Sequence, residues 1–457
     1  MNSNAIISDR RAQAAHLLRR AGFGGTPAEI DELAAMSHSD AVEKMLAFKY
    51  DGNLAFNLQR KFDEVGYIAN LSDLQYWWLL TMVRTKQPLQ ERMTLFWHGH
   101  FTTAYSKVKR EMELMQQNQL YRDFALGNFK EMVKQVSRNP AMIEYLDGQS
   151  NRKGKPNENY ARELMELFTV GIGNYSEQDV RGAARAFTGW SYKGQAYSFN
   201  KAQHDDGPKT FMGKTGNFNG DDIIDIIIDN RQSGRFITTE LWNTFAYANP
   251  APEIVERLTD VFYKNNYSIQ EVMRAIFNSP EFLSPQAYRA IIKNPAELVV
   301  GALRQLGTTG VEVNVARATS AMGQVLFSPP TVKGWDGGLS WINSSLYFER
   351  ANGMNSLALG RGANDRFDPQ RIISTANVDS TDGLVDHFLS RLLDGDTSPE
   401  VRSTLLDYVK ADGKFKFDDL KAASMGKQAN QANLKLADTK VRGLVHLILA
   451  TPEYQLK

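Results

Sequence analysis

Two of the seven histidines in this chain lie one residue apart in "HGHF", directly after an amphipathic segment that ends in Phe96 and Trp97. On a regular helix the side chains of His98 and His100 point about two hundred degrees apart. They can bind one metal ion together only if Gly99 ends the helix or the segment is extended. The alternative is structural, because a protonated histidine at the C-terminal end of a helix is stabilised by the helix dipole.

A second set of polar residues lies in "NENYARELMELFTVGIG". On a helix, Asn159, Arg162, Glu163 and Glu166 fall within about one hundred degrees of arc, opposite the apolar residues. A buried stripe would supply metal ligands or a general acid and base, with Asn159 as a substrate contact. A solvated stripe would supply only an Arg162–Glu166 pair worth roughly a few tenths of a kcal/mol. We expect these side chains to be mostly buried in a polar network.

The third set lies in "QHDDGPKTFMGKTGNFNG". His204 and Asp206 are candidate metal ligands, and Asp205 is a candidate catalytic carboxylate. Lys209 and the glycines after it suit an anionic group held by backbone N–H donors, although the spacing does not match a Walker A loop. Because His204 lies in a Gly- and Asp-rich loop rather than on an apolar face, we expect it to matter more for function than for folding.

The fourth set is the turn-rich stretch "SPPTVKGWDGGLSWINSSLYFER". Its prolines and glycines predict a rigid loop, and Trp335 and Trp341 offer large flat surfaces. These rings either pack inward as the cap of a core or form a wall against which a sugar or another ring of the substrate stacks.

Helical periodicity dominates the segments that carry these residues, for example "LSDLQYWWLLTMVRTKQ" and "PLQERMTLFWHGHF". "SEQDVRGAARAFTGW" opens with Ser176 and Asp179 in capping-box spacing. The near-alternating "AYSFN" and "KTFMG" predict a small β-hairpin. We therefore expect a mainly α fold: a multi-helical main domain over residues 1–358 with a hairpin near 192–216, and an additional helical segment over 359–457 that packs on it.

Composition limits the function classes. The 457 residues include 53 Lys plus Arg and 52 Asp plus Glu, so no overall positive field would attract nucleic acid. The absence of cysteine excludes disulfides, thiolate metal sites and a cysteine nucleophile. No stretch approaches the roughly 20 apolar residues of a membrane span. The sequence as it stands predicts a cytoplasmic protein, or a secreted or periplasmic one if a leader was removed.

Taken in order, five separated motifs resemble the bacterial family known as domain of unknown function 1800: "HLLRRAGFG", "FWHGHF", "NYARELMELFTVG" with "DVRGAARAFTGW", "HDDGPKTFMGKTG" and "PPTVKGWDGG". The resemblance runs from about residue 12 to 355 and includes the terminal "TPEYQL". It implies no particular reaction. Members are often secreted and encoded beside proteins that resemble alkaline phosphatases and sulfatases, so the resemblance implies a partner protein of that type.

These motifs carry polar residues at positions where the folding of a helix or loop does not require them. This favours one shared site. We expect a metal-dependent enzyme, most simply a hydrolase, in which a divalent metal ion held by some of these His, Glu and Asp side chains activates water. Arg162 and Lys209 would balance the charge of an anionic substrate. The alternative is a non-catalytic binding or assembly protein for a secreted partner or a polysaccharide.

Overall fold

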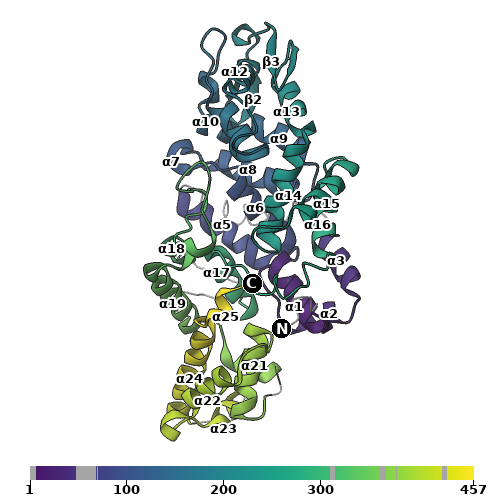
Figure 1. The fold of residues 1–457 in the computed structure, drawn as a ribbon. Helices are drawn as coiled ribbons and strands as arrows, with labels where there is room; N and C mark the ends of the chain where they lie inside the picture. The colour runs from purple at the N-terminus through teal and green to yellow at the C-terminus, as the bar shows by residue number, and fades with distance from the viewer. Residues whose placement is uncertain are drawn as a thin grey trace.

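The computed structural model describes residues 7–47, 68, 70–308, 314–360, 367–376, 378–424 and 430–457. The fold is mainly α, as the periodicity predicts, and the molecule is elongated (Figure 1). The helices of the first half, in chain order, are α1 (Arg10–Ala21), α2 (Pro27–Ala34), α3 (His38–Leu46), α5 (Leu71–Arg84), α6 (Pro88–His100), α7 (Tyr105–Val108), α8 (Glu111–Asp123), α9 (Phe129–Arg138), α10 (Pro140–Tyr145), η1 (Gly148–Ser150), α11 (Asn159–Glu163), the π-helical turn η2 (Leu164–Thr169) and α12 (Glu177–Ala186).

The expected hairpin region contains two hairpins, at the top of Figure 1. Strand β1 (Trp190–Lys193) pairs antiparallel with β2 (Ala196–Phe199), and β3 (Lys209–Phe211) pairs with β4 (Lys214–Gly216) after the short helix η3 (Lys201–Gln203). The second hairpin turns through two residues with positive φ, which is the requirement of a type I′ turn.

The second half is again helical. Its elements are α13 (Gly220–Asp229), α14 (Arg231–Phe245), α15 (Pro252–Lys264), α16 (Ile269–Phe277), α17 (Pro295–Gln305), α18 (Asn314–Ala321), η4 (Gly338–Ile342), α19 (Ser344–Leu359), α20 (Pro369–Thr375), α21 (Thr381–Leu393), α22 (Pro399–Lys410), η5 (Ala411–Gly413), α23 (Phe417–Ser424), α24 (Gln431–Leu449) and α25 (Pro452–Gln455). Helices α21 to α24 form the lower end of the molecule in Figure 1.

Helix ends follow local chemistry. Ser176 and Asp179 form the predicted capping box at the start of α12, and Pro88 occupies the first turn of α6. Helix α1 begins at Arg10, where the Asp9 side chain accepts a hydrogen bond from a backbone N–H, and Gly22 follows its last residue. These signals are local, so the sequence alone predicts them.

Two clusters of buried apolar side chains hold the helices together. The first lies among α1, α6, α12 and α14, and the second connects α5 and α17 with α21 and α24. Helix α6 contributes Trp97 to the first cluster and Leu95 to the second, so it lies between them. Positions on α6 are therefore fixed by packing on both sides.

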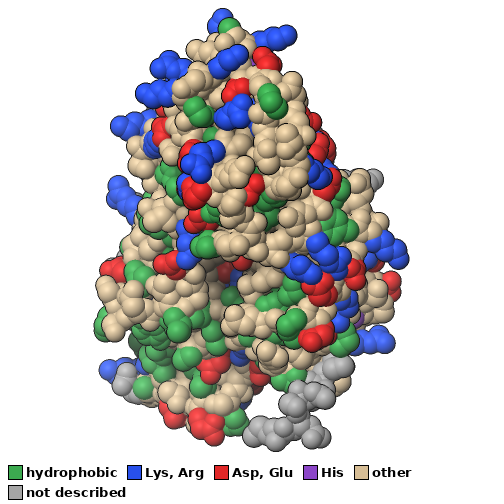
Figure 2. Space-filling model, turned by 45° about the horizontal axis from the view of Figure 1, so that its top comes forward, with side chains coloured by type: hydrophobic (Ala, Val, Ile, Leu, Met, Phe, Trp, Pro, Cys, Tyr) green, Lys and Arg blue, Asp and Glu red, His purple; other side chains and the backbone are tan. Residues whose placement is uncertain are grey.

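The last residues return to the middle of the molecule. Ile292 and Leu456 form an antiparallel bridge, and the backbone N–H of Lys457 donates to the carbonyl of Ile291 at 2.8 Å. Within the described residues, no helix combines the length and apolar character that crossing a membrane requires. On the face drawn in Figure 2, basic and acidic side chains are interspersed, in keeping with the near-zero net charge.

Candidate functional site

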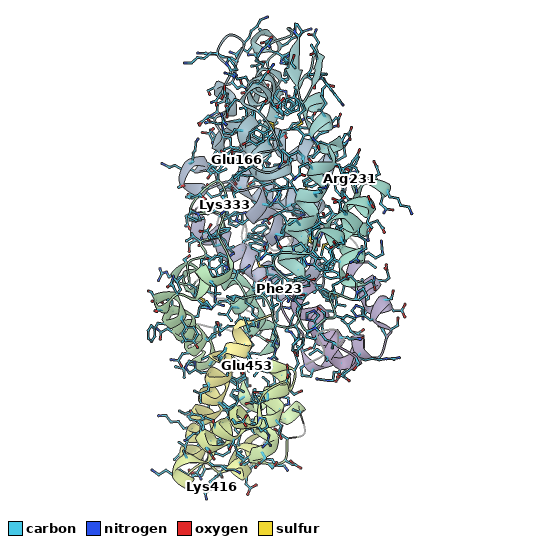
Figure 3. The ribbon with its side chains drawn as sticks, in the orientation of Figure 1. Phe23, Glu166, Arg231, Lys333, Lys416 and Glu453 are labelled. Atoms are coloured by element: carbon cyan, nitrogen blue, oxygen red, sulfur yellow. The ribbon has the colours of Figure 1, made fainter. Side chains whose placement is uncertain are left out.

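A cleft of about 580 Å³ lies where α6, η2 and α14 meet the loop before η4. Its walls carry His100, Glu166, Glu240, Trp335 and Trp341. Residues from "HGHF" and "NYARELMELFTVG" therefore meet in the cleft, together with tryptophans from the segment that follows "SPPTVKG", whereas the "HDDG" loop does not reach it. Figure 3 shows Glu166 and Lys333, two residues of this lining, close together in the middle of the molecule.

The two histidines of "HGHF" face different surroundings because α6 continues through His100. His98 is buried against Trp78 and Trp335, and its Nε2 accepts the backbone N–H of Phe327 at 3.1 Å. Burial lowers the pKa of His98 to about 3. The ring is therefore neutral, and its Nε2 lone pair is used to hold the loop that carries Phe327.

His100 lines the cleft. Its Nε2 donates to the Phe168 carbonyl at 3.0 Å, which fixes the tautomer and leaves the lone pair on Nδ1. Burial lowers the pKa of His100 to about 4. Stabilisation of a protonated ring by the helix dipole therefore does not apply at neutral pH, because the cost of burying the charge exceeds it.

The polar stripe of "NYAREL" is divided by a change in the helix. α11 ends at Glu163 and the chain continues as the π-helical turn η2, whose wider turn shifts the side chains that follow. Arg162 consequently pairs with Glu158 and Glu177 at 3.2 and 2.7 Å. These two partners replace the Arg162–Glu166 pair of the solvated alternative. Glu166 instead lines the cleft and accepts the Tyr175 hydroxyl at 2.6 Å.

The expectation of a mostly buried stripe is wrong for its first half. Asn159 is exposed and its amide donates to Asp147 at 3.2 Å, and Arg162 is only partly covered. Glu163 and Glu166 are half-buried. Burial, and then the neighbouring Glu166, raises the pKa of Glu163. Glu166 lines the cleft and remains a candidate for acid–base chemistry, whereas Glu163 is not part of the lining and Arg162 belongs to surface ion pairs.

The "HDDG" loop lies beside the hairpins and contributes no residue to the cleft lining. His204 is buried under Phe199, and its Nδ1 donates to the Thr188 carbonyl at 2.8 Å. Its Nε2 is 3.9 Å from Asp206, whose side chain is 65% exposed. The expectation that His204 avoids an apolar face is therefore wrong, because the loop folds back onto the turn after α12 and Phe199 covers the ring.

Asp205 and Lys209 complete a local network in the same loop. Arg185 donates to Asp205 at 2.7 Å, and this hydrogen bond lowers the pKa of Asp205 to about 2. Lys209 is buried and donates to the backbone carbonyls of Asp205 and Gly207 at 2.5 and 3.0 Å. Asp205 thus forms hydrogen bonds with Arg185 and within the loop, Lys209 forms hydrogen bonds within the loop, and neither side chain lines the cleft.

The two tryptophans of the "GWDGG" loop line the cleft. Trp341 is buried, with 6% exposure, while Trp335 is half-buried with its ring 5.7 Å from that of His98. The loop approaches α6 closely at Gly334, where an added Cβ would lie 2.7 Å from the Gly99 carbonyl oxygen. This contact needs glycine at 334, and it sets the position of the next residue, Trp335.

Sequence reasoning missed most of the lining, including several charged residues. Glu240 on α14 and Lys333 lie on the walls, and Arg92, Glu297 and Lys457 lie at the floor. Burial raises the pKa of Glu240, and the nearby Lys333 opposes this shift. The sequence could have indicated that Arg92 is buried, because it lies three residues after Leu89 and therefore on the apolar side of its helix.

The motifs converge only in part. His100 and Glu166 share the cleft, while His98 lies behind it and His204 with Asp206 lies near the hairpins. Across the part of the chain that the structure describes, no group of three His, Cys, Asp or Glu side chains is placed to hold a metal ion. A metal at the cleft would therefore need ligands from the substrate or water besides these two side chains.

Comparisons with known proteins give one positive finding. Neither the curated proteins nor the solved structures contain a match to this chain. A family model described as "Protein of unknown function (DUF1800)" matches residues 16–456, which include every motif from "HLLRRAGFG" to "TPEYQL". The chain is a member of the DUF1800 family.

Proposed function

We propose that this protein is a hydrolase whose active site is the cleft, with Glu240 as general acid and Glu166 as general base. The observation that carries the proposal is the presence of two half-buried carboxyl groups on the walls of one cleft that also has two tryptophan walls. Burial raises the pKa of Glu240, which favours its protonated form. Glu166 accepts the Tyr175 hydroxyl, which keeps its carboxylate oriented as a base.

A divalent metal ion is the second part of the proposal. His100 is the residue among His98, His100, His204 and Asp206 that lines the cleft, and its Nδ1 lone pair is available because Nε2 binds a backbone carbonyl. In this metal-dependent form Glu166 would be an oxygen ligand from the same wall instead of the general base. A bound ion would polarise the scissile group and activate water, and Trp335 and Trp341 would hold a ring of the substrate.

The test is an assay with nitrophenyl esters, phosphates and glycosides, before and after chelation and re-addition of Zn²⁺, Mn²⁺ or Mg²⁺, with elemental analysis of the purified protein. Glu240→Gln and Glu166→Gln should each lower kcat at least about 100-fold, as the loss of an acid or base does. The control is Glu253→Gln, an exposed carboxylate in the first turn of α15. Full activity in both cleft variants would eliminate the acid–base assignment.

The second candidate is a binding or assembly protein, favoured by exposed apolar side chains around the cleft. Ile172 is 77% exposed and lines the cleft, and Leu339, which lies in η4 between the lining residues Gly338 and Trp341, is 79% exposed. Such a rim fits a polysaccharide or a partner of the alkaline phosphatase or sulfatase-like type. Gel-retardation with soluble polysaccharides separates the candidates. Binding alone would be favoured if a polysaccharide retards the protein, Leu339→Ser abolishes the retardation, and none of the nitrophenyl substrates is hydrolysed.

A further inference from the structure

Six cationic side chains are buried together below the cleft. Their charges act on one another and on the same carboxylate, as the shared influences on their pKa values show. They are Arg19, Arg20, Arg92, Lys293, Arg350 and Lys457. Among the described residues, the carboxylates in ion pairs with them are Glu297, which pairs with Arg92 and Lys457, and Asp394, which pairs with Arg19. Burial lowers the pKa values of Lys293 and Lys457 to about 7, so these two lysines are only partly charged at neutral pH. The four arginines nevertheless outnumber the two carboxylates.

Several donors in this cluster have no hydrogen-bond partner among the described residues. Arg92 uses one nitrogen for Glu297, while its Nε and Nη2 are buried without a hydrogen bond. Arg20 leaves Nε and Nη1 unpaired, and Arg350 leaves Nη1 unpaired. Burying a charged donor without a partner costs several kcal/mol by general estimates. An anion that satisfied these donors would remove a large part of that cost.

Part of the cluster lines the cleft. Arg92, Glu297 and Lys457 all belong to the cleft lining, together with the side chains of Asn294 and Gln324. Glu297 is held by both cations and by the backbone N–H of Asn294 at 2.9 Å. An anionic group that enters from the cleft therefore meets Arg92 and Lys457 first, with Arg20 behind them.

We propose that the floor of the cleft binds an oxyanion, a phosphate, sulfate or carboxylate group, through Arg92 and Lys457, with Arg20 and Arg350 adding positive potential from below. The planar fork of an arginine suits two oxygens of such a group, and lysine adds a point charge. The anion is either a free ion or the charged group of a larger molecule whose ring lies against Trp335 and Trp341. The second case rests on the proposed function, but the site itself is defined by binding and needs no turnover.

The experiment is isothermal titration of the full chain with inorganic phosphate and sulfate, against chloride at equal ionic strength. Saturable binding of phosphate or sulfate is expected. Arg92→Gln and Lys457→Gln should each weaken it at least tenfold. Glu297→Gln should tighten it at least threefold, because it removes the carboxylate that competes for the same two cations; a purely structural role of the cluster predicts no such gain. Lys416→Gln, an exposed lysine at the far end of the molecule in Figure 3, should leave the affinity unchanged.

Circular dichroism shows which variants fold. If Arg92→Gln does not fold, the affinity of Lys457→Gln decides the test. Phenyl phosphate and phenol separate the two sources of the anion. Phenyl phosphate that binds more tightly than inorganic phosphate, with no binding of phenol, assigns the anion to a ring-bearing ligand; equal affinities assign it to a free ion. Absence of saturable binding of every oxyanion, or equal affinity in the parent and Lys457→Gln, would overturn the proposal. Neither result depends on whether the cleft hydrolyses anything.

Discussion

At the scale of single residues, "HGHF" shows how one side chain can be structural and its neighbour available for chemistry. His98 holds the Phe327 loop through a neutral ring, and His100 faces the cleft. Helix geometry alone gives diverging rings, and the prediction that both bind one metal ion required Gly99 to end the helix, whereas α6 continues through His100. The sequence could not tell which ring is enclosed, because Trp78, Phe327 and Trp335 come from three other segments.

The buried ring of His98 makes the fold sensitive to acid. Its pKa is about 3 in the folded protein against 6.5 ordinarily. Between these two values the ring is protonated in the unfolded chain but not in the folded one. Its contribution to stability is complete above about pH 6.5 and is lost as the pH falls from 6.5 towards 3, by up to about 1.4 kcal/mol per pH unit. His98→Gln keeps an acceptor for the Phe327 N–H, and urea unfolding at pH 7 and pH 5 should show a shallower loss in this variant than in the parent. If the parent and the variant lost the same free energy of unfolding between pH 7 and pH 5, the assignment to His98 would be contradicted.

His204 gives a second residue-scale prediction. Because it is buried and bonded to the Thr188 carbonyl, His204→Ala should lower the free energy of unfolding by about 1–3 kcal/mol. Asp206→Ala, at the exposed neighbour of the same loop, should change it by about 0.5 kcal/mol or less. Both values come from urea titrations at neutral pH. A His204→Ala variant as stable as the parent would restore the view that this histidine serves function more than folding.

At the scale of elements, regular helices and hairpins were predictable and irregular backbone was not. Periodicity and caps gave α6, α12 and the hairpin region, because each depends on residues close in sequence. The π-helical turn had no comparable signal in the sequence. The Thr169 hydroxyl donates to the Leu164 carbonyl and the Val170 N–H donates to the Met165 carbonyl. An ordinary helical sequence pattern is compatible with both hydrogen bonds. That turn decides that Glu166 faces the cleft and Arg162 does not.

The loop that carries Trp335 depends on one glycine. Gly334 has φ of +90°, and an added Cβ would lie 2.7 Å from the Gly99 carbonyl oxygen. Gly154 has φ of +79° but open space around the same position, so it controls for the backbone strain alone. Gly154→Ala should cost about 1 kcal/mol in thermal or urea unfolding, and Gly334→Ala should cost about 1–3 kcal/mol more, because either the loop or α6 must shift. Equal costs would mean that the close approach to α6 is not maintained.

At the scale of the whole molecule, charge is neutral overall and strongly uneven inside. Composition showed the near-equality of acids and bases, but it could not show that six cations are enclosed around two carboxylates. The pairs join distant parts of the chain: Arg19 and Asp394 are 375 residues apart. Such partners are determined by how the two apolar clusters pack, and no local pattern in the sequence records them.

The Arg19–Asp394 pair should therefore contribute to holding the first helix against the C-terminal helices. Both side chains are almost fully covered, whereas Arg402 and Asp386 form an exposed pair between α21 and α22. Asp394→Asn suits the left-handed backbone at this position, φ of 60°, and removes only the charge, so Arg19 is left buried without its counter-charge. The expected loss is about 3 kcal/mol in urea unfolding, against less than about 1 kcal/mol for Asp386→Asn. Similar small losses in both variants would mean that water or another anion already compensates Arg19, and that α1 is held to the C-terminal helices by apolar packing alone.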